Sequence, residues 1–519
     1  MRSAGTPVLA LSLALTAAQA HPGHAMPRRA AAKFAPDADK AAAVADVFNT
    51  AWAGYHDHAF PNDTLHPVSN TGENDRNAWG VTPVDALSTA IIMGNKDVVN
   101  QILDFVPTID FTTTQEAESE ISVFETNIRY IGGLISAYDL LKGPFKDLVT
   151  DEDKVESLLK QVTTLADTLS FAFDTPSGIP DPTVILNPSP RLKGSGNNGI
   201  AGCGTLVLEW TRLTDITGNQ TYTELTQKAE DHLLRPQGSP EAFPGLVGEG
   251  VSLETGEFLD SQGGWNAGTD SFYEYLIKMY LYDPEAFDFY RERWVLAADS
   301  TMEHLASHPT TRDDLTFLLQ FDGPDKLTPT SGHLASFAGG NFILGGVLLG
   351  EQKYIDFGVH LAESYYATYS TAAGIGPEGF DWVDANISSS GNPPDDQADF
   401  YEKQGFWATS PNYILRPETM ESLYYAYRAT GDAGFQDKGW EAFQHIRDAC
   451  RAGSGYSGLK DVTKADGGGF DDFMESFFLA ETLKYAYLLF AEESEVQFKV
   501  DAPNGWVFNT EAHPVRVRA

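Results

Sequence analysis

The chain has 519 residues, and its hydrophobic (42%) and aromatic (12%) side chains suffice for a large core, which excludes a mainly disordered protein. Its 35 basic and 73 acidic residues give a net charge of −38, which disfavours binding to nucleic acid or anionic membranes and is compatible with a neutral or cationic ligand. Most of these carboxylates are expected to form a solvated surface, since charged residues are mostly exposed.

A targeting segment is predicted at the N-terminus. A short basic start precedes an apolar run over residues 8–18, and residues 18–20 (Ala-Gln-Ala) form a small-x-small cleavage site. The run is too short to span a bilayer, and no later stretch reaches the ~18 uninterrupted apolar residues that a transmembrane helix needs. We therefore expect a signal peptide over residues 1–20, a leader over residues 21–40, and a secreted protein without a membrane anchor.

Three N-x-S/T sequons agree with a secretory route, and they predict N-glycosylation at Asn62, Asn219 and Asn386. The two cysteines, Cys203 and Cys450, allow one disulfide, but the sequence does not decide whether they pair. Their positions exclude a CxxC zinc site.

Helical periodicity begins at residue 41 and continues to about residue 495. Further helices are predicted over residues 84–93, 121–141, 153–171, 204–214, 270–281, 339–349, 418–430 and 474–492. Several of these segments are apolar nearly all round, as in residues 206–210 and 477–480, so they should lie inside a layer of other helices. The pattern predicts an all-α barrel, built as one domain over residues 41–519.

The C-terminal segment has a different pattern. Residues 495–500 alternate like a short strand, and residues 506–508 could pair with them. We therefore expect a C-terminal β-hairpin.

Acidic residues recur inside or at the start of the apolar helices. The clusters are Glu125 with Arg129, Asp270 with Glu274, Glu418 with Glu421, and Glu475 with Glu481. Each cluster alone fits a surface ion pair or a helix-dipole partner. A buried carboxylate, however, needs a partner, and four such clusters beside aromatic residues indicate one shared pocket. Such a pocket suits acid and base catalysis on a glycosidic bond, or binding of a hard cation such as calcium.

Nine segments carry a resemblance to a known family. They are residues 84–87, 122–138, 204–210, 270–276, 333–340, 374–378, 415–422, 475–485 and 507–514. In these segments the chain resembles the class I α-mannosidases, glycoside hydrolase family 47, and most of all the secreted fungal-type members. The segments follow the order of the family from about residue 45 onward.

The resemblance implies an (α/α)7 barrel with a short C-terminal β-hairpin that plugs one end. It implies an inverting, exo-acting mannosyl-oligosaccharide 1,2-α-mannosidase that needs Ca²⁺, with Thr510 as the direct calcium ligand. Glu125 would be the general acid and Glu418 the general base, and Asp270 would be a third catalytic carboxylate of open role. The substrate-binding residues implied or considered are Arg129, Glu209, Glu274, His333, Arg416, Glu421, Glu475, Phe477, Glu481 and Glu511. His333 fits a structural histidine equally well.

Two departures from the family pattern are visible. Ser336 and Ser364 occupy the positions of the usual disulfide, so a lower stability is expected without loss of activity. Gly268 stands where some members carry an arginine that restricts which glycan branch is trimmed. A small residue there predicts that several α-1,2-linked mannoses are removed.

The expected partners are high-mannose N-glycans or α-1,2-mannooligosaccharides, and the expected state is a monomer. The main alternative is a protein of the same fold that binds mannose glycans without cleaving them. The presence of all three carboxylates argues against it. A barrel glycosidase for another sugar is disfavoured by residues 509–514, which would supply the calcium ligand.

Overall fold

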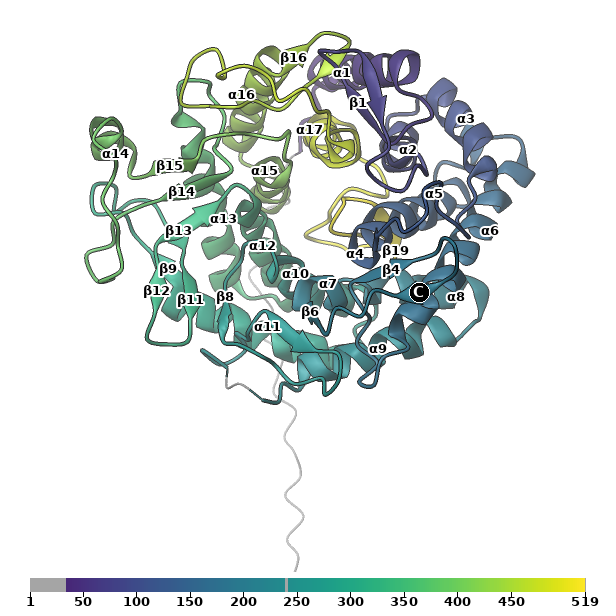
Figure 1. The fold of residues 1–519 in the computed structure, drawn as a ribbon. Coiled ribbons are helices and arrows are strands. Elements are labelled where there is room, and N and C mark those ends of the chain that lie inside the picture. The colour runs from purple at the N-terminus through teal and green to yellow at the C-terminus, as the bar shows by residue number, and fades with distance from the viewer. Residues whose placement is uncertain (1–33, 239–240, 519) are drawn as a thin grey trace, which may run out of the picture.

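A ring of helices makes up most of the molecule. The computed structural model describes residues 34–238 and 241–518, so the predicted signal peptide and most of the predicted leader lie outside the described residues. Figure 1 shows two layers of helices around a central opening, into which the C-terminal segment reaches.

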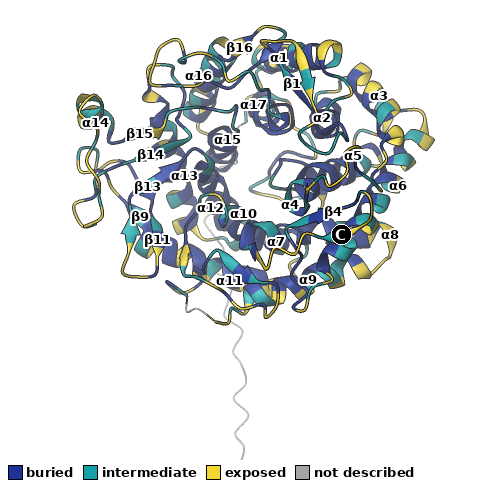
Figure 2. Cartoon of the chain, viewed as in Figure 1, coloured by how far each residue is buried: buried dark blue, intermediate teal, exposed yellow. Residues whose placement is uncertain are grey.

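The inner layer consists of helices that are buried on nearly every side (Figure 2). In the described part of the chain these are α2 (Val81–Ile92), α5 (Gly132–Leu141), α8 (Val207–Thr217), α10 (Asp270–Tyr282), α12 (Ala338–Leu349), α15 (Glu418–Thr430) and α17 (Leu483–Phe490). Every residue of α2 is buried, because this helix packs on α3, α5 and the turn before α17. Helices that are apolar all round require such a position, and the prediction of an inner helical layer is confirmed.

The outer helices are amphipathic. They are α1 (Ala38–His58), α3 (Lys96–Phe105), α6 (Glu152–Leu169), α9 (Thr221–Leu234), α11 (Asp288–Ser300), α13 (Gln352–Tyr366) and α16 (Ala433–Ala449). In α6, for example, Val155, Leu158, Val162 and Leu165 are buried at spacings of three and four residues. Each outer helix packs on an inner one, and the fold is thus the predicted (α/α)7 barrel. Within residues 34–238 and 241–518, no helix combines the length and apolar character needed to cross a membrane.

The ring closes between its first and last helices. α1 packs along α17, and the amide of Asp37 donates a hydrogen bond to the carbonyl of Phe490 at 2.9 Å. The Asp37 side chain also accepts a hydrogen bond from Lys40 N and caps α1, so this helix begins within the predicted leader of residues 21–40.

Short elements complete the barrel. The short helices are α4 (Val123–Glu125), α7 (Ile200–Gly204) and α14 (Ala398–Gln404), and residues 126–131 and 478–482 form π-helical turns that lead into α5 and α17. The strands form small antiparallel sheets: β1 (Thr64–His66) with β2 (Thr71–Glu73); β3 (Ile121–Ser122), β4 (Thr183–Ile185) and β5 (Arg191–Leu192); β6 (Asn197–Gly199) with β7 (Gly250–Ser252); β8 (Gln262–Gly263), β11 (Gln320–Asp322) and β12 (Leu327–Thr328); β9 (Ala306–Ser307) with β10 (Phe317–Leu318); β13 (Thr330–Gly332), β14 (Gly379–Asp381) and β15 (Trp407–Ser410); β16 (Arg451–Ala452) with β17 (Gly455–Tyr456); and β18 (Trp506–Phe508) with β19 (Pro514–Arg516).

The C-terminal hairpin exists, but its strands differ from the prediction. β18 pairs with β19, in the register Phe508 to Pro514, whereas residues 495–500 form no strand. In that segment the hydroxyl of Tyr424 on α15 accepts a hydrogen bond from the amide of Phe498 at 2.8 Å. Side chains of the inner helices therefore hold this backbone in place of a partner strand. β19 packs on α5 and β18 on α10, which places the hairpin at the inner layer.

Candidate active site

A pocket of about 370 Å³ opens at the centre of the ring. Most of the predicted site residues line it: Glu125, Arg129, Asp270, Glu274, Arg416, Glu418, Glu421, Phe477, Glu481, Thr510 and Glu511. Apolar side chains such as Phe124, Leu334 and Phe337 complete the wall. Helices far apart in the sequence thus bring the predicted carboxylates into one central pocket.

The three predicted catalytic carboxylates each stand in the first turn of a helix. Asp270 and Glu418 are the first residues of α10 and α15. Glu125 lies in α4, and its amide donates a hydrogen bond to the capping Ser122 hydroxyl at 3.2 Å. The inner helices therefore present their N-terminal ends, which carry partial positive charge, to the pocket.

Arg129 is the cation that organises one side of the pocket. Its Nε lies 2.8 Å from Glu125 Oε2, and its Nη1 lies 2.8 Å from Glu511 Oε1 and 3.4 Å from Asp85 Oδ2. Burial would raise the pKa of Glu125, but the charges of Arg129 and Arg76 outweigh it and lower that pKa. Glu125 is therefore held as a carboxylate in the free pocket.

Glu418 has two partners, one just before its own helix and one in the segment after β13. His333 Nδ1 lies 2.9 Å from Glu418 Oε2, and Arg416 Nη1 lies 3.4 Å from Glu418 Oε1. Arg416 is itself fixed by Glu378, 2.6 Å from its Nε. Burial would raise the pKa of Glu418, but Arg416 and His333 hold it below its usual value. Glu418 is thus ionised and can accept a proton.

Asp270 is in a different protonation state. Burial raises its pKa to about 7, and the nearby carboxylates of Glu274 and Glu418 add to the effect, although the Ser271 amide donates to Asp270 Oδ1 at 2.7 Å. Among the three predicted catalytic carboxyls, Asp270 is the one that retains its proton most readily near neutral pH.

A second set of carboxyls lies deeper in the pocket. Burial raises the pKa of Glu421 and of Glu511 to about 8. Burial and the adjacent Glu511 raise the pKa of Glu481 well above its usual value. Glu274 pairs with Lys278, one turn further along α10. This crowding of acids at the floor of the pocket means that an added cation there would be favoured.

Thr510 lies at this floor, in the turn between β18 and β19. Its amide donates a hydrogen bond to the hydroxyl of Tyr275 at 3.2 Å. Within the described ranges, its carbonyl and hydroxyl oxygens form no hydrogen bond. Both oxygens are therefore free to bind a ligand.

The family model of glycosyl hydrolase family 47 matches residues 47–517. The chain belongs to glycosyl hydrolase family 47. A probable mannosyl-oligosaccharide α-1,2-mannosidase 1B of Aspergillus clavatus is 53% identical over 485 residues, which cover 92% of this chain and 93% of that protein. The mannosyl-oligosaccharide α-1,2-mannosidase 1B of Aspergillus oryzae is 50% identical over 520 residues, which cover 100% and 99% of the two chains. The structure of an α-1,2-mannosidase from Trichoderma reesei matches with a TM-score of 0.92 at 61% identity, covering 93% of this chain and 100% of that one.

Three predicted residues of this family 47 glycosidase do not line the pocket. His333 lies behind Glu418, and Glu475 is part-buried with a pKa that burial raises. Glu209 lies beneath the floor, where its Oε1 accepts hydrogen bonds from the Tyr275 hydroxyl at 2.7 Å and from Asn509 Nδ2 at 2.9 Å. His333 and Glu209 thus support the pocket from behind.

A group that was not predicted as part of the site supports Arg129. Asp85 lies 3.4 Å from Arg129 Nη1, accepts a hydrogen bond from the Ser476 hydroxyl, and lies 3.3 Å from His513 Nε2. His513 Nδ1 in turn lies 2.9 Å from the Ser88 hydroxyl. Asp85 and His513 both occur in the family-like segments. However, no local pattern shows that residues 428 positions apart meet.

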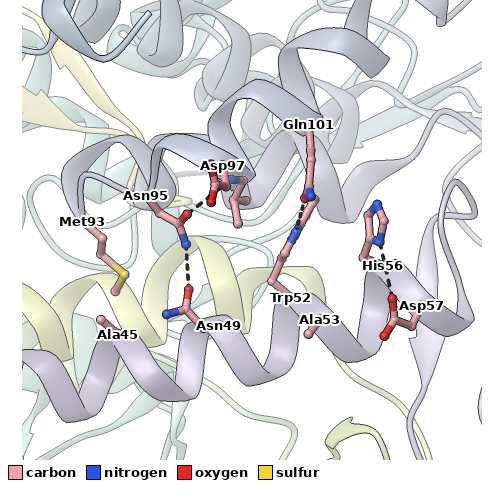
Figure 3. A pocket seen from close by; sticks show the side chains of 11 residues that line it. Ala45, Asn49, Trp52, Ala53, His56, Asp57, Met93, Asn95, Asp97 and Gln101 are labelled. Atoms are coloured by element: carbon pink, nitrogen blue, oxygen red, sulfur yellow. Dashed lines mark hydrogen bonds and ion pairs between the residues drawn. The ribbon is translucent and has the colours of Figure 1, made fainter.

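A second hollow lies on the outside of the family 47 barrel, between α1 and α3 (Figure 3). Its polar groups bind one another: Asn95 Nδ2 donates to Asn49 Oδ1 at 2.6 Å, and Trp52 Nε1 donates to Gln101 Oε1 at 2.8 Å. Trp52 is only 4% exposed, so it offers no ring face to a sugar. None of the predicted site residues lies there.

Cys203 and Cys450 are both free and buried. The disulfide that the sequence left open is therefore not formed. Of the three sequon asparagines, Asn219 and Asn386 are exposed and Asn62 is part-buried. Glycosylation at these sites stays a prediction.

Proposed function

We propose that this glycosidase removes terminal α-1,2-linked mannose from high-mannose N-glycans or α-1,2-mannooligosaccharides, with inversion and with calcium. The relatives named above are called mannosyl-oligosaccharide α-1,2-mannosidases. The observation that carries the proposal is the convergence of Glu125, Asp270 and Glu418 on one pocket of about 370 Å³. Paired carboxyl groups on either side of a glycosidic bond are what inverting hydrolysis requires.

Glu418 is proposed as the general base. Its lowered pKa keeps it ionised, so it can take a proton from water as that water attacks the sugar. His333 and Arg416 fix its two oxygens, which orients the carboxylate. A base held in this way activates water on one face of the sugar only, as inversion demands.

For the role of general acid, the protonation states of the two carboxyl groups favour Asp270 over Glu125. The resemblance gave this role to Glu125, but Arg129 stabilises its ionised form, whereas Asp270 has a pKa of about 7. We propose that Asp270 holds the proton for the leaving oxygen and that Glu125 orients the substrate with Arg129. The pH dependence of kcat/KM separates the two roles: D270N should remove the alkaline limb, and E125Q should lower the rate and keep that limb.

The pocket wall fits a sugar. Phe477 lines the pocket, and the guanidinium of Arg129 lies over its ring, 5.6 Å from the ring centroid. Sugar hydroxyls need charged or polar partners, and Arg129, Arg416, Glu274, Glu421, Glu475, Glu481 and Glu511 are proposed for them, with Glu209 supporting the floor.

The residues present fit calcium. Two observations support this: the free carbonyl and hydroxyl oxygens of Thr510, and Glu511 Oε2, a buried oxygen without a hydrogen-bond donor. Among the described residues, no three His, Cys, Asp or Glu side chains are placed to hold a metal directly. This suits a site in which Thr510 is the direct ligand and the surrounding carboxylates act through waters. When bound, calcium would supply positive charge that orients the hydroxyls of the terminal sugar.

The protein is further proposed to be a secreted monomer. The N-terminal signal pattern and the exposed asparagines of two sequons, Asn219 and Asn386, support secretion. Analytical ultracentrifugation of protein purified from culture medium tests both statements together. A protein retained in the cells, or one that sediments as a dimer, would refute the corresponding statement.

The deciding experiment is mannose release from a high-mannose N-glycan, with and without a chelator. Release that is lost on chelation and restored by calcium, with the β-anomer formed first, is the expected result. A folded, calcium-replete sample that binds the glycan without releasing mannose would favour the non-catalytic alternative instead. The double variant E418Q/D270N serves as the inactive control.

A further inference from the structure

Two buried lysines lie beneath the floor of the central pocket. Lys278 on α10 is 1% exposed and Lys484 on α17 is 0% exposed. Burying an ammonium group is costly unless partners compensate it. The hydrolysis proposed above uses neither lysine, so their positions need another explanation.

Both lysines donate to the main chain of the same turn. Lys278 Nζ lies 3.2 Å from the carbonyl oxygen of Asn509, and Lys484 Nζ lies 2.6 Å from the carbonyl oxygen of Ala512. These two carbonyls flank Thr510 on either side along the chain. Two different inner helices therefore hold the turn of residues 509–513 by hydrogen bonds from buried amino groups.

The side chain of Asn509 fixes the rest of this turn. Its Oδ1 accepts hydrogen bonds from the amides of Glu511 at 2.9 Å and His513 at 2.8 Å. Its Nδ2 donates to the carbonyl of Ile128 at 2.9 Å and to Glu209 Oε1. Main-chain groups on both sides of Thr510 are thus hydrogen-bonded, while its own carbonyl and hydroxyl oxygens form no hydrogen bond within the described residues.

Charge balance is the competing explanation for the lysines. Lys278 pairs with Glu274. Lys484 lies near Glu481, Glu511 and Asp85, which oppose the effect of burial, and burial lowers its pKa to about 7. The two explanations predict opposite changes in calcium affinity when a lysine is removed. If the lysines acted only as charges, their removal would relieve repulsion and tighten calcium binding. If they shape the turn, their removal would weaken calcium binding.

We infer that Lys278 and Lys484 are positioning residues, which hold the turn of residues 509–513 so that the Thr510 oxygens are arranged for calcium before it binds. The inference rests on the proposed calcium site. The hydrogen bonds favour it over charge balance, because both ammonium groups point at main-chain carbonyls of the turn rather than only at carboxylates.

The first test measures calcium affinity by calorimetry on chelator-stripped protein without substrate. K278M and K484M, each of which keeps the apolar stem, should weaken calcium binding by roughly tenfold, since each loses a buried hydrogen bond to the turn. The control K142M removes an exposed lysine that pairs with Glu156, and it should leave the Kd unchanged. An unchanged or tighter Kd in both buried variants would overturn the inference.

A second test needs no variant. Hydrogen exchange of the metal-free wild-type protein reports the amides of Glu511, Ala512 and His513, whose acceptors all lie on Asn509. We expect them to be protected without calcium. If they exchanged freely until calcium was added, the turn would not be held beforehand and the inference would fail.

Failure of the proposed calcium site and failure of the lysine inference give different results. If the wild-type protein bound no calcium, the calcium part of the proposed function would be refuted, and this inference with it. If the wild-type protein bound calcium but the lysine variants bound it equally well, the inference alone would be refuted.

Discussion

His333 Nδ1 lies 2.9 Å from Glu418 Oε2, and Nε2 of the same ring lies 2.8 Å from the hydroxyl of Tyr369. The His333 side chain is completely buried, so no water can replace either contact. A tyrosine, a histidine and a carboxylate therefore form one chain of hydrogen bonds that ends at the proposed base. Whether His333 acts on the base or is only a structural histidine is therefore a question of how these two contacts affect Glu418.

Replacing this histidine should impair the base. H333A is expected to lower kcat by roughly 10- to 100-fold, because the base loses a positioning contact. It should also move the acidic limb of the pH profile to higher pH, because the hydrogen bond from His333 lowers the pKa of Glu418. The control Y369F removes only the outer contact and should shift the profile less, in the same direction. A variant that melts earlier but keeps the wild-type pH profile would show a purely structural histidine.

Asp270 should make stability depend on pH. Its pKa is raised from 3.8 to about 7, so its stabilising effect is fully present below pH ~4 and is lost as pH rises through 7. D270N should therefore gain stability over the wild type between pH 5 and pH 8, by at most about 3 kcal/mol. Denaturant unfolding of both proteins at the two pH values measures this difference in stability. The control D288N changes the first residue of α11, an exposed aspartate whose pKa is lowered, and should show no such gain.

Gly268 lines the pocket and has a φ of +95°, a conformation that favours glycine. A Cβ at this position would also lie 2.5 Å from Glu249 Oε1. G268R should narrow the set of mannoses released, as seen by mass spectrometry of timed digests of a high-mannose glycan. G268A is the matched control, since it carries the backbone strain without the long side chain. Equal product patterns for G268R and the wild type would refute the role in branch choice.

Ser336 and Ser364 should accept an engineered disulfide. Both are fully buried, and the segment around Ser336 packs on α13, which carries Ser364. When oxidised, S336C/S364C should have a free energy of unfolding about 2–4 kcal/mol higher than that of the wild type. Part of the gain will be offset, because the Ser364 hydroxyl accepts a hydrogen bond from Thr316 N at 3.0 Å. The reduced form of the same variant is the control. Identical unfolding of the oxidised and reduced forms would contradict the prediction.

Inner helices such as α10 and α15 could be predicted from sequence with nearly the observed bounds. Both are rich in aromatic and aliphatic residues, and their first turns carry acids that need a pocket. The hairpin could be predicted only in part. Residues 495–500 alternate like a strand, but the side chains of Tyr424 and Arg428 on α15 bond the amide and the carbonyl of Phe498. A periodicity of two cannot reveal this competition.

The contacts that support the site residues could not be predicted from the sequence, for a different reason. Asp85 meets His513, and Lys484 meets Ala512, only because the ring brings the last turn under the first inner helix. Protonation states depend on the same geometry: Asp270 and Glu418 look alike in sequence, yet arginine and histidine neighbours surround only one of them. Burial and neighbouring charge follow from the tertiary fold.

The closure of the ring by α1 and α17 also fixes an order in time. During synthesis α1 emerges first, and the face that packs on α17 stays uncovered until the end of the chain has been made. The hydrogen bond between Ala35 and Tyr427 spans 392 positions. The Thr510 turn is made later still. A partly synthesised chain therefore holds most of its acidic residues without the floor that organises them, and hydrolysis can begin only once the whole barrel has been made.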